Sequence, residues 1–166
     1  MTNKKGNIIA SARFSDGAVA ELRLEISLDK ERRLWQIRLM EPEENVTCFR
    51  ETDLYKAMQA LREHLEAKGG QLLCAGARPD VVPSGMSRDM GGGRKAYVIQ
   101  LGKQATEIVD IFAYAEPAAV GTVQQQRKFV EAWWASLDAQ RCRPRLRRES
   151  KSRLLTWFEN LFSKSR

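Results

Sequence analysis

The sequence predicts an α+β fold in which a mostly antiparallel six-stranded sheet has two helices packed on one face. Three observations lead to this prediction. The first strands alternate between apolar and polar residues, two later segments repeat apolar residues at helical spacing, and the elements follow in the order βββαβββα. A C-terminal amphipathic helix is expected after them. With 166 residues, the chain is long enough for one domain with a substantial core.

The first three strands are predicted at residues 8–14, 20–28 and 35–39, as a meander with short turns. Ser15-Asp16-Gly17 is a typical tight-turn sequence. The acidic loop 41–45 contains a proline that ends the third strand. The second strand alternates most strictly, so one of its faces should be buried and the other wet. Its expected inward positions are Ala20, Leu22, Leu24, Ile26 and Leu28.

Two helices are predicted from their apolar stripes. The first should run from about Thr52 to Lys68 and stop at the pair Gly69-Gly70. The second should begin at Thr122, because Thr122 and Gln125 have the spacing of a capping box, and continue to Leu137. Its expected stripe consists of Val123, Val130, Trp134 and Leu137, widened by Phe129 and Trp133.

Between the two helices, the sequence predicts strands at residues 71–75, 96–101 and 109–112. A loop of about twenty residues, 76–95, would join the first two. Such a loop is far longer than a hairpin turn, and long ordered loops usually bind or cover something. Its charged residues could simply be solvated, but their mixture with methionines favours a recognition surface. The candidate partner-binding residues are Arg78, Asp80, Met86, Arg88, Asp89, Met90 and Arg94, with Tyr97 in the strand that follows.

The glycine run Gly91-Gly92-Gly93 stands just before Arg94 and Lys95. Backbone N–H groups beside cations can hold a phosphate, but this run lacks the spacing of a phosphate-binding loop. A turn that needs positive φ angles is the favoured interpretation.

The net charge of +7 belongs entirely to the C-terminal segment. Residues 1–140, taken as the folded domain, carry 19 basic and 19 acidic residues, whereas residues 141–166 carry 9 and 2. The neutral domain gives no reason to expect specific nucleic-acid binding.

The C-terminal segment begins as a basic linker, in which Arg141–Arg148 contains five arginines. Residues 150–164 then form one apolar arc on a helical wheel. This helix could dock on its own domain, lie on an anionic membrane or bind a partner protein. The residues of the arc are Leu154, Leu155, Trp157, Phe158, Leu161 and Phe162.

The residue inventory offers little for catalysis. His64 is the only histidine, and no Cys-x-x-Cys pair is present, so no metal, cofactor or catalytic residue is expected. Cys48 and Cys74 stand among apolar residues and are expected in the core. No secretory signal follows Met1 and no apolar run could span a membrane as a helix, which makes a cytoplasmic location the default expectation.

Several segments between Leu34 and Leu137 form one pattern: Gly76-Ala77-Arg78, Pro83-Ser84-Gly85-Met86-Ser87, Met90 to Tyr97, Val109-Asp110-Ile111-Phe112 and the tryptophan-bearing helix 122–137. Together these segments resemble small bacterial immunity proteins, which are encoded beside polymorphic or contact-dependent toxins. The resemblance implies a non-enzymatic inhibitor that binds a cognate toxin. The basic tail departs from the pattern. It supports an alternative function as a peripheral membrane or secretion-apparatus accessory protein.

Overall fold

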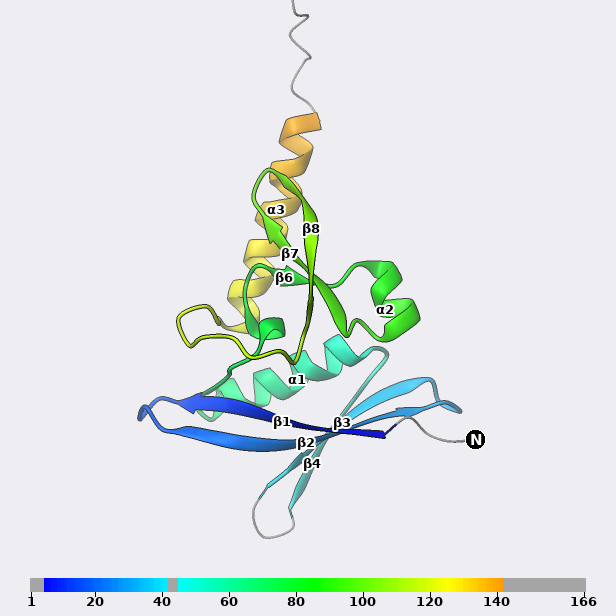
Figure 1. Cartoon of the computed structure of the whole chain (residues 1–166), viewed down its shortest axis with the longest axis vertical. Helices are drawn as coiled ribbons and strands as arrows, with labels where there is room; N and C mark the ends of the chain where they lie inside the picture. Colours follow the sequence, from blue (N-terminus) through cyan, green and yellow to red (C-terminus); the bar gives the residue numbers. More distant parts are fainter. Residues whose placement is uncertain (1–4, 42–44, 142–166) are drawn as a thin grey trace, which may run out of the picture.

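The computed structural model describes residues 5–41 and 45–141, which form an α+β protein with a curled antiparallel sheet and three α-helices (Figure 1). The sheet forms the base of the molecule, helix α1 lies across it, and a smaller β-hairpin with helix α3 stands above α1. The tail residues predicted to contact a membrane or a partner, Leu154, Trp157, Phe158, Leu161 and Phe162, lie outside the described residues.

The base of the molecule is a five-stranded sheet in the order β4-β3-β2-β1-β5. Its strands are β1 (Lys5–Phe14), β2 (Val19–Asp29), β3 (Leu34–Met40), β4 (Val46–Glu51) and β5 (Gly70–Leu72). All pairs are antiparallel, and the register places Ile8 beside Leu24 and Ile26 beside Ile37. The expected meander of the first three strands and its inward face are therefore confirmed.

Strand β4 is absent from the sequence prediction, which assigned no element to residues 46–51, between the acidic loop and the first helix. Its inward positions are Thr47, Phe49 and Glu51, opposite Leu39, Ile37 and Trp35. Only one of the three is apolar, so no alternation marks the strand. Cys48 points to the other face and is exposed, which makes its expected place in the core wrong. Cys74 is buried as expected.

Helix α1 (Leu54–Ala67) covers the inner face of the sheet over β3, β4 and β5. It begins two residues later than predicted, because the Asp53 side chain accepts a hydrogen bond from the Lys56 N–H (2.8 Å) and so caps the helix. The helix ends beside Gly69, whose φ of 73° requires a glycine-like residue. Its buried apolar residues, among them Leu54, Met58 and Leu61, form the core with the sheet.

Between α1 and α3, only β5 joins the first sheet, and it ends at Leu72, whereas the strand was predicted at residues 71–75. The chain then forms a separate three-stranded antiparallel sheet in the order β6-β7-β8, which corrects the predicted single six-stranded sheet. The predicted twenty-residue loop is ordered and contains three elements: a 3₁₀ turn at Ala75–Ala77, β6 (Val81–Val82) and α2 (Gly85–Gly91). Strands β7 (Lys95–Gln100) and β8 (Lys103–Asp110) follow as a hairpin.

The last predicted strand was placed too late, at residues 109–112. Strand β8 begins at Lys103, just after Gly102 turns the chain with a φ of 70°. Its first residues are polar because β8 is an edge strand, so their pattern does not resemble a core strand.

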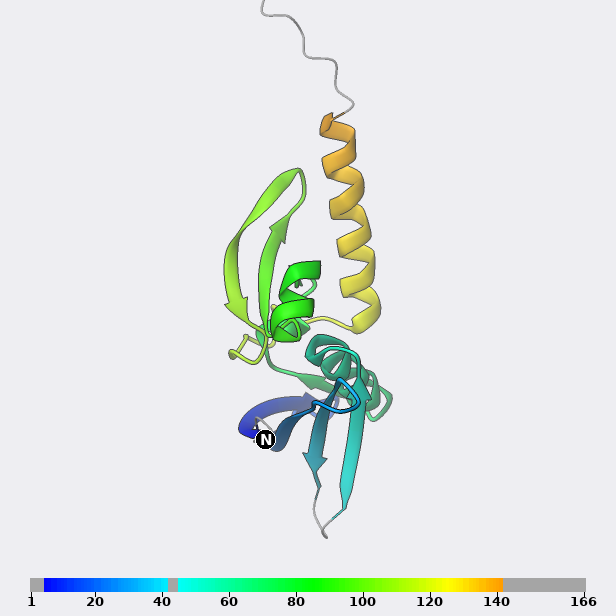
Figure 2. The ribbon, with the colours of Figure 1, turned by 90° about the vertical axis from the view of Figure 1, so that its right-hand side faces the viewer.

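Helix α3 (Val123–Arg141) stands beside the β7–β8 hairpin (Figure 2). The predicted capping box is confirmed: the Gln125 N–H donates to the Thr122 hydroxyl, and the Thr122 N–H donates to the Gln125 side chain. The predicted stripe needs one correction. Trp133 is 7% exposed and donates from its indole N–H to the Lys103 carbonyl, whereas Trp134 is 56% exposed.

A buried arginine joins the two halves of the molecule. Arg62 of α1 is almost fully buried and donates to the side-chain oxygen of Gln126 in α3 (2.6 Å) and to the carbonyls of Gly76 and Gly121 (3.2 and 2.8 Å). Burial lowers the pKa of Arg62 from its usual value. The Gln126 amide in turn donates to the carbonyl of Val81, so these two side chains fix the segment that leads into α2.

Candidate protein-binding site

Helix α2 is a short helix whose two ends are capped by its own sequence. The Ser84 side chain accepts a hydrogen bond from the Ser87 N–H (3.1 Å) at the N-terminus. At the C-terminus, Gly92 has a φ of 65°, and the N–H groups of Gly92 and Gly93 donate to the carbonyls of Arg88 and Ser87. The bond from the Gly92 N–H to the Arg88 carbonyl is that of an αL motif, which favours glycine at the left-handed position. The glycine run thus serves a positive-φ turn, as predicted, and Gly91 is the last residue of the helix.

Three contacts hold α2 against α1 and the five-stranded sheet. The Arg88 guanidinium pairs with the carboxylate of Asp53 (3.1 Å), which also caps α1. The same guanidinium lies 5.8 Å from the Tyr55 ring centre. The Tyr55 N–H donates to the Gly92 carbonyl (3.0 Å). The Trp35 ring packs so closely on Gly92 that an added Cβ would lie 2.5 Å from its Cε2 atom.

Although α2 is held at its ends, none of its residues is buried. Met86 is 73% exposed and Met90 is 84% exposed, which makes them the two most exposed large apolar side chains among the described residues. A large exposed apolar side chain on an ordered helix has no folding role of its own. Flexible methionine side chains are frequent where proteins bind one another.

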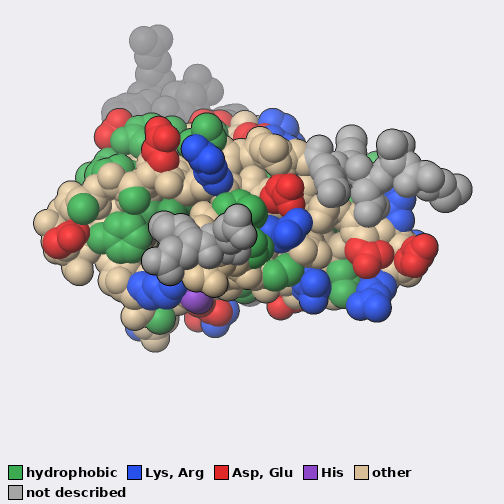
Figure 3. Space-filling view, turned by 90° about the horizontal axis from the view of Figure 1, so that it is seen from below, with side chains coloured by type: hydrophobic (Ala, Val, Ile, Leu, Met, Phe, Trp, Pro, Cys, Tyr) green, Lys and Arg blue, Asp and Glu red, His purple; other side chains and the backbone are tan. Residues whose placement is uncertain are grey.

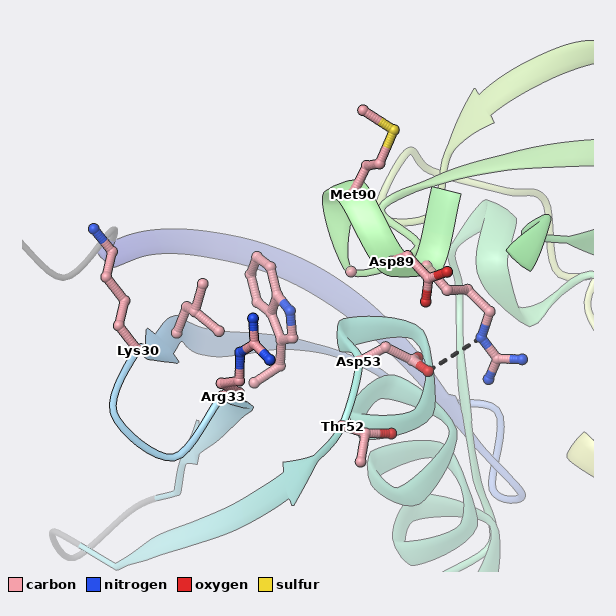
Figure 4. A pocket seen from close by; sticks show the side chains of 10 residues that line it. Lys30, Arg33, Thr52, Asp53, Asp89 and Met90 are labelled. Atoms are coloured by element: carbon pink, nitrogen blue, oxygen red, sulfur yellow. Dashed lines mark hydrogen bonds and ion pairs between the residues drawn. The ribbon is translucent and has the colours of Figure 1, made fainter. Parts of the chain in front are cut away.

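Two open hollows lie between α2 and the five-stranded sheet, and together they form the α2 groove. The first, of about 560 Å³, lies between α2 and the β2–β3 turn. Figure 4 shows it, with Met90 and Asp89 on the α2 side and Lys30 and Arg33 on the turn. The second, of about 730 Å³, lies over the inner face of the sheet where β1 begins and β2 ends. Both hollows share Leu28, Trp35 and Met90.

The floor of the α2 groove is apolar because it consists of inward-facing residues of the sheet. It is open because α1 leaves this end of the sheet uncovered. Ile8 and Leu28 are only half-buried there, although they belong to the inward-facing set of the sheet. The floor consists of Ile8, Ile26, Leu28, Trp35 and Leu54.

The rim of the α2 groove is predominantly basic. It carries five basic side chains and two acidic ones: Lys30, Arg33, Arg88, Arg94 and Lys95 against Asp53 and Asp89. Within the described part of the chain, Lys30 and Arg33 pair with no carboxylate. Arg33 holds a left-handed backbone conformation, with a φ of 53°. That conformation is uncommon for a residue other than glycine.

Arg94 and Lys95 share a single carboxylate at the far end of the groove. The Asp110 side chain lies 2.9 Å from Arg94 and 3.6 Å from Lys95. Partial burial opposes ionisation of this carboxyl, but the hydrogen bond from the Phe112 N–H and the two cations outweigh it and lower the Asp110 pKa. The pair of cations therefore keeps an excess of positive charge beside an ionised aspartate.

The α2 groove has the properties of a binding surface and lacks a recognisable catalytic arrangement. Of its two acidic residues, Asp53 is already engaged as a helix cap and as the partner of Arg88. His64 lies in the last turn of α1 against Phe49, and it lines neither hollow. Among residues 5–41 and 45–141, no group of three His, Cys, Asp or Glu side chains could hold a metal ion.

The structure brings together most of the predicted partner-binding residues. Met86, Arg88, Asp89 and Met90 lie on α2, and Arg94 lies at the edge of the second hollow. Three predicted residues lie elsewhere. Arg78 and Asp80 pair with each other through two hydrogen bonds (2.9 and 2.6 Å) beside Phe129 of α3, and Tyr97 is half-buried in β7.

The sheet side of the groove was missed by the sequence prediction. Leu28 and Trp35 were predicted as inward positions of strands, and nothing in their spacing indicates that α1 leaves them uncovered. The cations of the β2–β3 turn were treated only as turn residues. Their one available signal was a cluster of charge, Asp29-Lys30-Glu31-Arg32-Arg33, and such clusters are usually solvated.

The other exposed surfaces have less pronounced properties. Figure 3 shows the outer face of the five-stranded sheet, where acidic and basic side chains are interspersed in the visible part. At the start of the acidic loop, Glu41 pairs with Lys68 (3.0 Å), and that hydrogen bond lowers the pKa of Glu41. Figure 1 places the adjoining ends of β3 and β4 far from α2.

No protein-family model matches the sequence, and no curated protein matches it. Within the described part of the chain, no helix combines the length and the apolar character that crossing a membrane requires.

Proposed function

We propose that the protein binds another protein through the α2 groove and the two methionines above it, and that it acts without catalysing a reaction. More specifically, we propose that it is an immunity protein that neutralises a cognate bacterial toxin in the cytoplasm. The observation that carries it is the exposure of Met86 and Met90, 73% and 84%, on a helix held by its caps and by Arg88.

The physical argument concerns the cost of forming an interface. Binding requires a few apolar anchors that become fully desolvated within a polar rim. The methionines and the half-buried Trp35 provide the anchors, and the cations around the groove provide the rim. Because caps and contacts already order α2, little backbone entropy is lost when a partner binds.

The immunity function, as distinct from protein binding in general, rests on the sequence resemblance. The part of it that bears on α2 spans Pro83 to Tyr97, the segment that forms α2 and enters β7. An inhibitor needs only affinity and a surface that blocks its target, so it requires no cofactor and no catalytic group.

Capture of the partner followed by a growth assay tests this proposal. The tagged full chain is used to capture proteins from lysate of the source cells, and the captured partner is then expressed alone and together with the chain. We expect the partner to arrest growth when it is expressed alone, and the chain to restore growth. The variant Met86→Asp with Met90→Asp should fail to restore it.

The matched control changes two exposed apolar residues on the outer face of the sheet, Val19→Asp with Met40→Asp, which are 61% and 42% exposed. The control should restore growth as well as the natural chain does. Equal rescue by both variants would remove α2 from the proposed surface. A captured partner that does not arrest growth would rule out the toxin inhibitor and leave protein binding.

The second candidate function is membrane or secretion-apparatus attachment through the amphipathic tail. The apolar arc of residues 150–164 beside the arginine-rich linker favours it. Flotation of the full chain with anionic vesicles, lost in Trp157→Ala with Phe158→Ala, would support this function. Flotation unchanged by that variant would exclude the tail as the membrane contact.

A further inference from the structure

Strand β1 has a free edge along its first half. On one side, β1 pairs with β2 from Lys5 to Arg13. On the other side it pairs with β5 only at Ala12–Phe14, and one more hydrogen bond runs from the Leu73 N–H to the Ser11 carbonyl (2.7 Å). No strand in the described part of the chain pairs with residues 5–10 on that second side.

The backbone groups at this edge can be assigned from the pairing. In an antiparallel strand, the N–H and C=O of one residue point to the same side, and successive residues alternate. The Ser11 carbonyl points towards β5, so the backbone groups of Asn7 and Ile9 point to the same side, where no strand of residues 5–41 or 45–141 pairs with them. The residues between them bond to β2, as the register of Ile8 with Leu24 requires. An unpaired row of this kind is a template for an additional strand.

The free edge borders the apolar part of the α2 groove. Gly6, Asn7 and Ile8 line the second hollow together with Leu28 and Met90. Figure 1 shows α2 above the end of the sheet where β1 begins. A strand placed beside β1 would lie about 4.8 Å from it. The inward side chains of that strand would then be neighbours of Ile8 and would enter the hollow.

Charge indicates the chemistry of such a strand. Arg94 and Lys95 line the same hollow, and among the described residues they share only the Asp110 carboxylate, so a further carboxylate beside them would be stabilised. The same charge argues against the chain's own tail as the occupant, because residues 141–166 carry 9 basic and 2 acidic residues. A basic tail beside a basic rim would be repelled.

We propose that the partner protein contributes an extended segment, with apolar side chains and a carboxylate on one face, that pairs with the free edge of β1 at residues 6–10. The segment becomes an additional strand of the five-stranded sheet, and its apolar side chains occupy the α2 groove. This inference deepens the proposed function and rests on it, since it specifies what kind of protein segment the groove receives.

The test uses a displayed library of random twelve-residue peptides selected against the full chain. We expect the selected peptides to be rich in apolar residues and to contain Asp or Glu. N-methylation of the peptide backbone at single positions should weaken binding at every second position only, because a paired strand uses alternate N–H groups. Weakening without this alternation would overturn the proposal, as would selected peptides that lack acidic residues.

A proline variant tests the same edge from the protein side. Asn7→Pro removes an outward N–H that β2 does not use, so the strand keeps its pairing with β2. The Asn7→Pro variant should bind the selected peptides at least tenfold more weakly than the natural chain does. The matched control is Cys48→Pro on β4, the strand at the opposite edge of the sheet. The Glu41 N–H donates to the Asn45 carbonyl, so every second residue of β4 from Asn45 bonds to β3. The Cys48 N–H therefore points away from β3, as the Asn7 N–H points away from β2.

Because proline could also disturb folding, both variants are first compared with the natural chain by thermal unfolding. The N-methyl series provides the evidence if Asn7→Pro alone is destabilised. Binding equal to that of the control would overturn the proposal. Competition by a synthetic peptide of residues 150–164 would also overturn it, because the groove would then receive the chain's own tail.

The failure of this inference can be distinguished from failure of the proposed function. If the partner is lost in Met86→Asp with Met90→Asp but unaffected by Asn7→Pro, the partner binds at α2 without joining the sheet. If neither variant affects the partner, the proposed surface itself is wrong.

Discussion

Replacing Gly92 with alanine should weaken the attachment of α2 and with it the stability of the whole chain. Gly92 has a φ of 65°, a conformation that costs a residue with a Cβ roughly 1–2 kcal/mol. An added Cβ would also lie 2.5 Å from Cε2 of Trp35, and displacing a packed ring typically costs about 1–3 kcal/mol. The two effects together predict a loss of about 2–5 kcal/mol in the free energy of unfolding.

The neighbouring Gly91 provides a matched control, because it ends α2 with no positive φ and with no atom within 4 Å of an added Cβ. Gly91→Ala should leave the free energy of unfolding unchanged or raise it by up to about 1 kcal/mol, since alanine favours a helix over glycine. Urea unfolding followed by circular dichroism measures both variants. Equal stability of Gly92→Ala and Gly91→Ala would refute the packing of Trp35 on this turn.

Three further predictions follow from contacts elsewhere in the chain. In a double-mutant cycle of Arg62→Met and Gln126→Ala, each single change should lower the free energy of unfolding by about 2–4 kcal/mol, with a coupling energy of about 0.5–3 kcal/mol. Strict additivity would contradict the 2.6 Å hydrogen bond between the two side chains. Trp133→Phe should lower the free energy of unfolding by about 0.5–1.5 kcal/mol, because it removes the hydrogen bond to the Lys103 carbonyl, while Trp134→Phe should change it by no more than about 0.5 kcal/mol. The reverse order would mean that Trp134, and not Trp133, faces the hairpin. The Asp110 pKa is lowered on folding, so the stabilising contribution of this carboxylate is complete above about pH 4 and is lost as the pH falls through the folded value. The difference in stability between the natural chain and Asp110→Asn should therefore shrink on acidification. A constant difference from pH 7 to pH 2 would contradict this assignment.

The fold could be predicted from the sequence where burial on one side determines the residue pattern. Strand β2 is such a case, because its inner residues meet the core and its outer residues meet water. Strand β4 could not be predicted, since only Phe49 of its three inward positions is apolar. Helix α2 could not be predicted from periodicity because none of its residues is buried, so it has no apolar stripe. Its only signals were local, the Ser84 cap and the glycine at the C-terminus.

The candidate site was predicted on one side and missed on the other. The methionines and charges of α2 stand out because they occur where a loop was expected. The sheet half of the groove consists of residues such as Leu28 and Trp35, which have the pattern of ordinary core positions. Only the placement of α1 over β3, β4 and β5 decides that these two stay partly open, and that placement depends on contacts between distant segments.

The measurement that tests the central claim most directly is the dissociation constant of the captured partner, determined by titration calorimetry. The natural chain is compared with Met86→Asp with Met90→Asp and with the outer-face control, Val19→Asp with Met40→Asp. We expect the α2 variant to bind at least tenfold more weakly, a loss of about 1.4 kcal/mol or more. The control should bind as the natural chain does. Identical dissociation constants for all three proteins would contradict the assignment of the α2 groove as the binding surface.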